Sequence, residues 1–335
     1  IVNEDLPFEL FYQPRQQTIE HFDQKKKHGV SNLLKHRKSY YTYHYRLGEL
    51  DDFYADALVP STKYLSTFDI CPYFDGFLLR VPKKTDHTQL EEITQQRKTY
   101  EIYKEHVNWC NLIGINNISD LNSLPKEHRS TLIKVSEALH EKKIAKIAEQ
   151  IAENKNIRIV LIAGPSSSGK TTTSKRLSVQ LAASGIKPRT LSLDNYYLTH
   201  DKTPLDEFGE LDFESLYALD LPLLNQQLGQ LIAGETVTPP IFNFKTEQRE
   251  WGKPMQLKEN EILVIEGIHG LNPELTASIP EENKFKVYVS ALTTLSLGPR
   301  NWLSTSDTRL LRRCIRDHKY RNYPAEKTIL RWPSV

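Results

Sequence analysis

The chain has 335 residues, which is long enough for two domains with separate cores. Its 39% hydrophobic and 26% charged residues are typical of a soluble protein, and no apolar stretch approaches the roughly 20 residues that span a bilayer, so we expect no membrane segment. The formal charge of +2 is too small to indicate nucleic-acid binding by bulk electrostatics.

The three cysteines, Cys71, Cys110 and Cys314, are far apart and odd in number. They indicate neither a disulfide framework nor a zinc site, and they fit a reducing compartment, so we expect a cytoplasmic protein. The chain opens at Ile1 without a methionine or a signal-peptide pattern, and it stops at Val335 without an evident terminal element. We therefore expect a fragment of a longer protein.

Residues 1–85 alternate short aromatic and apolar runs with turn signals, a pattern that predicts a small α+β domain. Helices are predicted at 88–107 and 127–154, with the turn-rich stretch 114–120 between them. The apolar residues of the second helix keep near-helical spacing, so one side should pack against a neighbouring domain. We interpret 86–154 as a helical connector.

The segment 155–335 alternates strands and helices and is predicted to be an α/β domain with a parallel sheet flanked by helices. Helices are predicted at 170–184 and 221–233. Three of the four strand candidates are short and nearly all apolar, as strands buried on both faces should be. The candidates are 157–163, 189–193, 262–265 and 285–289, the second being the less apolar one.

The first of these strands runs directly into Gly164-Pro-Ser-Ser-Ser-Gly-Lys170-Thr171, the G-x-x-x-x-G-K-[ST] pattern of a phosphate-binding loop. Its glycines let backbone N–H groups point at phosphates, Lys170 would neutralise them, and Thr171 would ligate Mg²⁺. A Gly/Ser-rich turn that matches by chance is the less favoured alternative. We predict an ATP-binding loop made of Gly164, Pro165, Ser166, Ser167, Ser168, Gly169, Lys170, Thr171 and Thr172.

Two acidic residues end neighbouring strand candidates. Asp194 follows the second strand, where a carboxylate can accept the proton of an attacking hydroxyl and help to hold the metal. Glu266 closes the third strand, where it could bind Mg²⁺ directly or through water. The alternatives are a turn-capping aspartate and an ordinary carboxylate at a strand end.

The basic stretch 308–321 is predicted to be a helix with several arginines on one face, because Arg309, Arg312, Arg313 and Arg316 recur at steps of three and four. Such a face could close over a transferring phosphoryl group. The alternative is a solvated helix paired with acidic neighbours, Asp307 and Asp317.

The segment 157–335 resembles the uridine kinase and phosphoribulokinase family. The resemblance implies that Asp194 is the catalytic base and that Lys170, Thr171 and Glu266 handle MgATP. It places Glu214 at the ribose, assigns Arg313 and Tyr197 to the nucleoside, and puts Arg316 and Arg321 in a catalytic lid. It rests on the loop motif and on Leu193-Asp194 with Tyr196 or Tyr197, Asp212-Phe-Glu-Ser215 leading to Asp220, Pro240-Ile-Phe-Asn-Phe244, Ile265-Glu-Gly-Ile268, and Asp307-Thr-Arg-Leu-Leu-Arg-Arg313 with Arg316-Asp317.

The chain departs from uridine kinases around the base. Phe242 and Glu247 stand where those enzymes place a tyrosine and a histidine, and Tyr323 and Arg331 where they place an arginine and a glutamine. A phenylalanine can still stack on a base, but a glutamate presents acceptors where an imidazole can donate. The base preference is therefore not carried over from the family.

The N-terminal segment resembles the later part of the editing-type second domain of threonyl-tRNA synthetases, through Asn3-Glu-Asp-Leu-Pro-Phe-Glu9, Tyr43-His-Tyr-Arg-Leu-Gly48 and Val59-Pro-Ser-Thr62. That domain's metal-binding cysteine and histidine fall at Tyr54 and Leu58, so editing hydrolysis is not expected. The resemblance implies a retained module for packing, oligomerisation or binding. Fusions of this kind form a bacterial group of uridine or nucleoside kinases, which the whole chain resembles.

Together these features predict an ATP- and Mg²⁺-dependent nucleoside kinase that acts on a 5′-hydroxyl, with uridine or cytidine as the expected substrate and a homo-oligomeric state. A kinase of another small alcohol, such as pantothenate or a sugar phosphate, would use the same loop, base and metal. An RNA-linked NTPase is the third hypothesis. The basic clusters 25–28 and 35–38 could contact RNA, but they are more simply explained as a solvated surface. A GTPase is disfavoured because no N-K-x-D motif follows.

Overall fold

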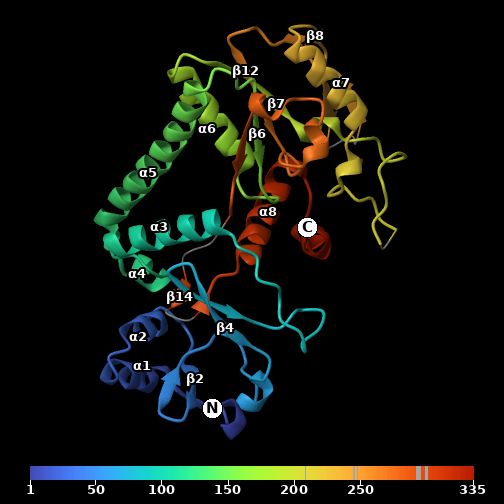
Figure 1. Ribbon diagram of the computed structural model, residues 1–335. Coiled ribbons are helices and arrows are strands. Elements are labelled where there is room, and N and C mark those ends of the chain that lie inside the picture. The colour runs from blue at the N-terminus through green and yellow to red at the C-terminus, as the bar shows by residue number, and fades with distance from the viewer. Residues whose placement is uncertain (208, 244–245, 247, 292–295, 299–300) are drawn as a thin grey trace. The chain divides into compact units, whose positions relative to one another are not determined.

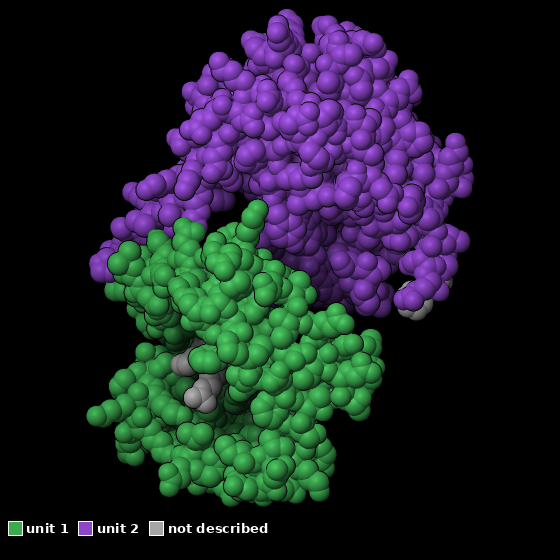
Figure 2. All heavy atoms as spheres, viewed as in Figure 1, with its two compact units in different colours: residues 1–126, 293–304 green, residues 127–292, 305–335 purple. Residues whose placement is uncertain are grey.

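The fold is that of a computed structural model, which describes all residues except 208, 244–245, 247, 292–295 and 299–300 (Figure 1). By its contacts the chain forms two compact units (Figure 2). Unit 1 comprises residues 1–126 and 293–304, and unit 2 comprises residues 127–292 and 305–335. The division at residues 85 and 154 that the sequence suggested stays a prediction.

Unit 1 is an α+β assembly. An antiparallel sheet of order β1-β2-β3 is covered by α1 and α2 around a small core of Ile19, Phe22, Val30, Leu34 and Phe53. A separate hairpin pairs β4 with β5, and β14 pairs with β15. Its elements are β1 (Glu9–Pro14), α1 (Arg15–Gln24), α2 (His28–Lys35), β2 (Tyr41–Leu47), β3 (Leu50–Asp52), β4 (Asp69–Tyr73), β5 (Gly76–Arg80), α3 (Arg97–Ile113), α4 (Ile118–Ser123), β14 (Ser296–Gly298) and β15 (Asn301–Trp302).

Unit 2 is built on a parallel sheet of order β13-β6-β12-β7, which confirms the predicted fold class. Beside this sheet, β8 pairs with β11 and β9 pairs with β10. Its elements are α5 (Lys126–Glu153), β6 (Ile159–Ala163), α6 (Lys170–Ala183), β7 (Lys187–Ser192), α7 (Leu221–Ile232), β8 (Thr236–Val237), β9 (Pro240–Asn243), β10 (Gln248–Trp251), β11 (Met255–Gln256), β12 (Glu261–Glu266), β13 (Lys284–Tyr288), α8 (Thr305–Arg321) and α9 (Ala325–Leu330).

Alternate residues of β6 point to opposite faces of the sheet, because side chains alternate along a strand. Val160 and Ile162 pack with α5 and α6, whereas Ile159 and Leu161 pack with α7. Helices therefore cover both faces, and α5 buries one side against the sheet as its spacing predicted. The parallel register places Glu266 opposite Ile162 and Ser192, so the carboxyl ends of three strands meet at one edge.

Three sequence predictions need correction. The strand at 285–289 was expected to be buried on both faces, but β13 is an edge strand that pairs with β6 and leaves Lys286 and Tyr288 exposed. The helix expected at 88–107 begins only at Arg97. The residues before it are tied outside the helix by hydrogen bonds such as that from the Tyr73 hydroxyl to the Thr94 carbonyl. The turn-rich stretch 114–120 contains the start of α4, which is capped by Asn117.

Within the part of the chain that the structure describes, no helix combines the length and the apolar character needed to cross a membrane.

Candidate active site

The loop between β6 and α6 is shaped by a close backbone approach. A β-carbon at Gly164 would lie 2.3 Å from the Val289 carbonyl oxygen, so only glycine fits there. Gly169 has a φ of 105°, a conformation that side chains disfavour, and α6 begins at the next residue, Lys170. The loop is therefore positioned by the buried strand and delivers its backbone to a helix N-terminus.

The polar groups of this loop fit phosphate. The hydroxyl oxygens of Ser167 and Ser168 are buried without a hydrogen-bond partner among the described residues. The Lys170 ammonium donates to the Pro165 carbonyl at 3.3 Å, and burial lowers the pKa of this lysine. Unpaired hydroxyls and a half-buried cation at a helix N-terminus are suited to phosphate oxygens.

Glu266 lies beside the loop at the end of β12. Its Oε1 accepts hydrogen bonds from the Thr171 hydroxyl at 3.2 Å and from the Ser192 hydroxyl at 3.0 Å. Burial is the main cause that raises the pKa of Glu266, and the negative charge of Asp194 is the second. Clustered hydroxyl and carboxylate oxygens are the ligands that Mg²⁺ prefers, so this group fits the metal that accompanies a nucleotide.

Asp194 lies in a short 3₁₀ turn, η3 (Leu193–Tyr196), that directly follows β7. Its carboxylate is 3.8 Å from the Arg321 guanidinium, and its side chain is 37% exposed, so it can meet a substrate. It lines a cavity of about 290 Å³ together with Ser167, Gly169, Lys170, Thr171, Thr172, Glu266, Arg312, Arg316 and Arg321. The predicted base, cation and metal ligands thus share one cavity.

Helix α8 supplies the arginines of this site. Arg309 donates from Nε to the Ser166 carbonyl at 2.9 Å, and Arg313 donates from Nη1 to the Ser166 hydroxyl at 3.1 Å. The same Arg313 nitrogen lies 3.2 Å from the Glu214 carboxylate. The predicted basic helix is therefore real, and its arginines contact the phosphate loop.

A second, narrower cavity of about 60 Å³ adjoins Asp194. The phenol of Tyr197 borders it and donates to the Phe213 carbonyl at 3.0 Å, while burial raises the pKa of that phenol. Its lining residues are Ser166, Lys170, Asp194, Tyr197, Glu214, Ile268, Arg313, Arg316 and Arg321.

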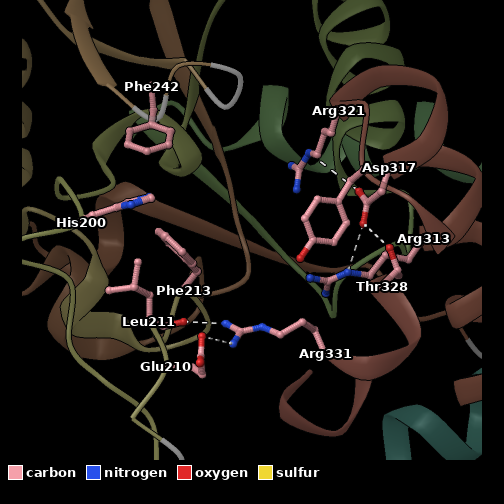
Figure 3. Close-up of a pocket in the computed structure, with 11 residues that line it drawn as sticks. His200, Glu210, Leu211, Phe213, Phe242, Arg313, Asp317, Arg321, Thr328 and Arg331 are labelled. Atoms are coloured by element: carbon pink, nitrogen blue, oxygen red, sulfur yellow. Dashed lines mark hydrogen bonds and ion pairs between the residues drawn. The ribbon is translucent and has the colours of Figure 1, made fainter. Parts of the chain in front are cut away.

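A larger cavity of about 410 Å³ lies next to the arginines (Figure 3). Aromatic rings form part of its wall: Phe213 meets Tyr197 and His200 edge-on at centroid distances of 5.6 and 5.7 Å. Arg331 borders it, donating to the Leu211 carbonyl at 2.7 Å. The lining residues are His200, Glu210, Leu211, Phe213, Phe242, Arg313, Asp317, Arg321, Tyr323, Thr328 and Arg331.

The structure brings nearly all the sequence-predicted site residues into unit 2 around these three cavities. Gly164, Pro165 and Ser168 belong to the loop without lining a cavity, and Phe242 lines the largest one. Glu247, predicted to contact the base, lies outside the described residues. The roles assigned to these residues stay predictions.

Several residues of the site were not predicted from the sequence. Ser192, which bonds Glu266, and Ile268, which lines the narrow cavity, lie close in the chain to predicted acidic residues at strand ends, a signal that could have identified them. His200, Glu210 and Leu211 come from a loop with no motif of its own.

In unit 1, His21, His44 and Asp51 bring three metal-ligating atoms within 4.8 Å of one another. The ammonium of Lys25 and the guanidinium of Arg46 already bond the Asp51 carboxylate. Because two cations neutralise the only acid of this group, a dication would be repelled, and we assign no metal to it.

Comparisons with known proteins cover about half of the chain. Residues 159–332 match the model of the Phosphoribulokinase / Uridine kinase family. The uridine kinase of Ureaplasma urealyticum is 25% identical over 177 residues, which is 53% of this chain and 77% of the relative. The uridine kinase of Deinococcus deserti is 27% identical over 51% of this chain and 73% of the relative. A solved structure described as a "Possible Uridine Kinase" from Bacillus stearothermophilus is 24% identical over 46% of this chain and 82% of that chain, with a TM-score of 0.34.

Proposed function

The chain belongs to the phosphoribulokinase / uridine kinase family and is a phosphotransferase, and we propose that it transfers the γ-phosphoryl group of ATP to the 5′-hydroxyl of a nucleoside, uridine or cytidine. One observation carries the proposal. Arg313 and Arg321 line both the narrow cavity at Asp194 and the larger aromatic cavity. A ring held in the larger cavity could therefore extend an attached hydroxyl to Asp194.

The chemistry of the larger cavity supports a nucleoside. Rings from His200, Phe213, Phe242 and Tyr323 border it, and aromatic surfaces stack on planar heterocycles. Arg331 offers donors for base carbonyl oxygens. Glu214 borders the narrow cavity together with Asp194, and its carboxylate can accept hydrogen bonds from ribose hydroxyls.

The proposed reaction balances with the residues at hand. Asp194 accepts the proton of the acceptor hydroxyl while that oxygen bonds to the γ-phosphorus, and the bond from the γ-phosphorus to the bridging oxygen breaks to release ADP. Lys170, Arg316 and Arg321 lie around the same cavity and would stabilise the negative charge of the transferring group. The arginines would also exclude water and so favour transfer over hydrolysis.

Mg²⁺ is the cofactor that this site would take. When bound, it would neutralise the charge of the phosphate groups. Thr171, Glu266 and Asp194 would hold it, since all three present oxygen atoms to the cavity that the phosphate loop lines.

Two other functions would use parts of the same site. A kinase of another small alcohol, such as pantothenate or a sugar phosphate, needs the same loop and base and differs only in the acceptor cavity. An RNA-linked NTPase would hydrolyse ATP without an acceptor. The aromatic wall favours the nucleoside over both, because it offers a flat apolar surface to a ring.

The test is ADP formation with MgATP against a panel of ribonucleosides, deoxyribonucleosides, pantothenate and ribulose 5-phosphate, with an RNA-only control. Acceptor-dependent ADP with one nucleoside class would support the proposal and identify the base. Hydrolysis that responds to RNA but to no acceptor would favour the NTPase.

We propose that unit 1 is a synthetase-like module, as its motifs suggest. It would act in packing or oligomerisation rather than in editing. Sedimentation of the wild type and of Phe77→Ser, a change at an exposed residue of the β4–β5 hairpin, would test the homo-oligomeric state. RNA binding by this unit and a cytoplasmic location remain proposals of lower priority.

A further inference from the structure

Asp317 is a buried carboxylate in α8, only 3% exposed, among arginines of the same helix. Its Oδ1 lies 2.9 Å from Nε and 2.7 Å from Nη2 of Arg316. Nε of Arg313 lies 3.5 Å from Oδ2, and Nε of Arg321 lies 3.9 Å from Oδ1. One buried anion is therefore shared by three guanidinium groups.

The same carboxylate reaches α9. The Thr328 hydroxyl lies 3.5 Å from Oδ2 (Figure 3). In the backbone, the Tyr323 N–H donates to the Asp317 carbonyl at 3.1 Å. Thr328 and Tyr323 both line the larger cavity. Asp317 thus connects the arginines to the wall where the acceptor is proposed to bind.

Each of these arginines also contacts the reacting site. Arg313 reaches the Ser166 hydroxyl of the phosphate loop, and Arg321 lies 3.8 Å from the Asp194 carboxylate. Arg316 lines the phosphate cavity. Three guanidinium groups repel one another and have many rotamers, so an anion shared by all three favours one common arrangement.

We propose that Asp317 is a positioning residue for phosphoryl transfer. It fixes Arg313, Arg316 and Arg321 so that they face the phosphate loop and Asp194 together, and it links their arrangement to the α9 wall of the acceptor cavity. Preorganised cations of this kind stabilise charge in a transition state without reorganising. The inference rests on the proposed kinase function.

A structural role alone would have a different signature. If Asp317 only joined α8 to α9, its loss would reduce the folded fraction and leave the kinetics of each folded molecule unchanged. Misplaced arginines would instead lower kcat, leave MgATP binding nearly unchanged and let a larger share of ATP react with water.

The experiment compares Asp317→Asn, Asp317→Glu and the control Asp307→Asn in the full chain. Asp307 lies in the first turn of the same helix and is exposed. Rates are expressed per folded enzyme, counted by binding of a fluorescent ADP analogue. For Asp317→Asn we expect kcat to fall by roughly 10- to 100-fold with the KM for MgATP within about threefold, since small misplacements of catalytic groups cost this much. Asp317→Glu should recover part of kcat, and Asp307→Asn should match the wild type.

A second readout needs no acceptor turnover. Aluminium fluoride with MgADP mimics the transferring phosphoryl group. It should tighten MgADP binding to the wild type, and the factor of tightening should be about tenfold smaller in Asp317→Asn. Equal kinetics and equal aluminium fluoride effects in Asp317→Asn and Asp307→Asn would overturn the inference. A wild type without any acceptor-dependent ADP would overturn the proposed function instead, while the aluminium fluoride comparison would still decide the role of Asp317.

Discussion

The Thr171 hydroxyl donates a hydrogen bond to the Glu266 carboxylate, with 3.2 Å between Oγ1 and Oε1. The two residues are 95 positions apart and come from the first turn of α6 and the last position of β12. Ser192, at the end of β7, donates to the same carboxylate oxygen. Three elements thus gather oxygen atoms at one point beside the phosphate loop, where the proposed metal would bind.

The first prediction concerns Glu266→Gln. Replacing a carboxylate ligand by an amide should weaken Mg²⁺ binding and lower kcat/KM by roughly 100-fold or more, whereas nucleotide binding without metal should change little. Titration of activity against Mg²⁺ would check this, with Glu259→Gln, an exposed residue just before the same strand, as the control. An unchanged Mg²⁺ requirement would remove Glu266 from the metal site.

The same variant has a predicted effect on stability. Burial raises the pKa of Glu266. In the absence of ligands, the ionised carboxylate is therefore less stable in the folded state than in the unfolded state. The destabilisation is absent below the ordinary pKa of a glutamate and develops as pH rises through the folded pKa. Glu266→Gln should therefore unfold at a higher temperature than the wild type at pH 8 but at about the same temperature at pH 4, which thermal unfolding without nucleotide would measure.

The second prediction concerns Asp194→Asn. An amide cannot accept the hydroxyl proton, so turnover should fall by about 100-fold or more, while the affinity for ATP should stay within a few fold. Single-turnover rates and nucleotide binding would be measured on the same preparation. A variant that lost ATP affinity but kept its turnover per bound enzyme would show that Asp194 is not the base.

The parts of the site that the sequence made predictable are those carried by short contiguous motifs. The phosphate loop, Asp194 and Glu266 each follow a buried strand directly, and parallel strands bring their carboxyl ends to one edge. The basic helix was evident from the spacing of its arginines. In these cases local order along the chain also determines position in space.

Other features depend on contacts between distant segments, and the sequence alone did not indicate them. The sequence marked Asp317 as part of the family motif and as a neutralising neighbour in a solvated helix, but its burial among three arginines was not predicted. The edge position of β13 follows from the order of the strands in the sheet, which no local pattern indicates. The start of α3 is fixed by Tyr73, whose hydroxyl bonds the Thr94 carbonyl and the Gln96 N–H just before the helix.

The third prediction concerns Arg331→Met. Arg331 borders the larger cavity, bonded to the Leu211 carbonyl and 3.7 Å from the Glu210 carboxylate. Loss of its donors should raise the acceptor KM by about tenfold and leave the KM for MgATP unchanged, because the residue is far along the chain from the phosphate loop and lines neither cavity at Asp194. Lys319→Met, an exposed cation in α8, is the matched control. Equal acceptor KM values in the two variants would argue that Arg331 does not contact the acceptor.

The fourth prediction concerns an ion pair outside the site. Glu261, at the start of β12, is buried, and Arg189 on the neighbouring strand β7 donates to both of its carboxylate oxygens, at 3.1 and 3.0 Å. These hydrogen bonds lower the pKa of Glu261 to about 2. Because the folded pKa is depressed, the charged pair stabilises the fold above the ordinary pKa of glutamate and loses this effect as pH falls from about 4.5 towards 2.

Glu261→Gln should therefore lower the free energy of unfolding by about 2 kcal/mol at pH 7, the cost of weakening hydrogen bonds to a charged group and leaving Arg189 without its counter-ion. The difference from the wild type should shrink as pH is lowered below 4.5, because the wild-type carboxyl then becomes protonated. Urea unfolding across this pH range would measure the difference. The transition that shifts when MgATP is added belongs to unit 2 and is the one to follow. Glu282→Gln, an exposed residue before β13, is the control. A difference that stayed constant with pH would mean that the pair stabilises the fold through packing of the two side chains rather than through charge.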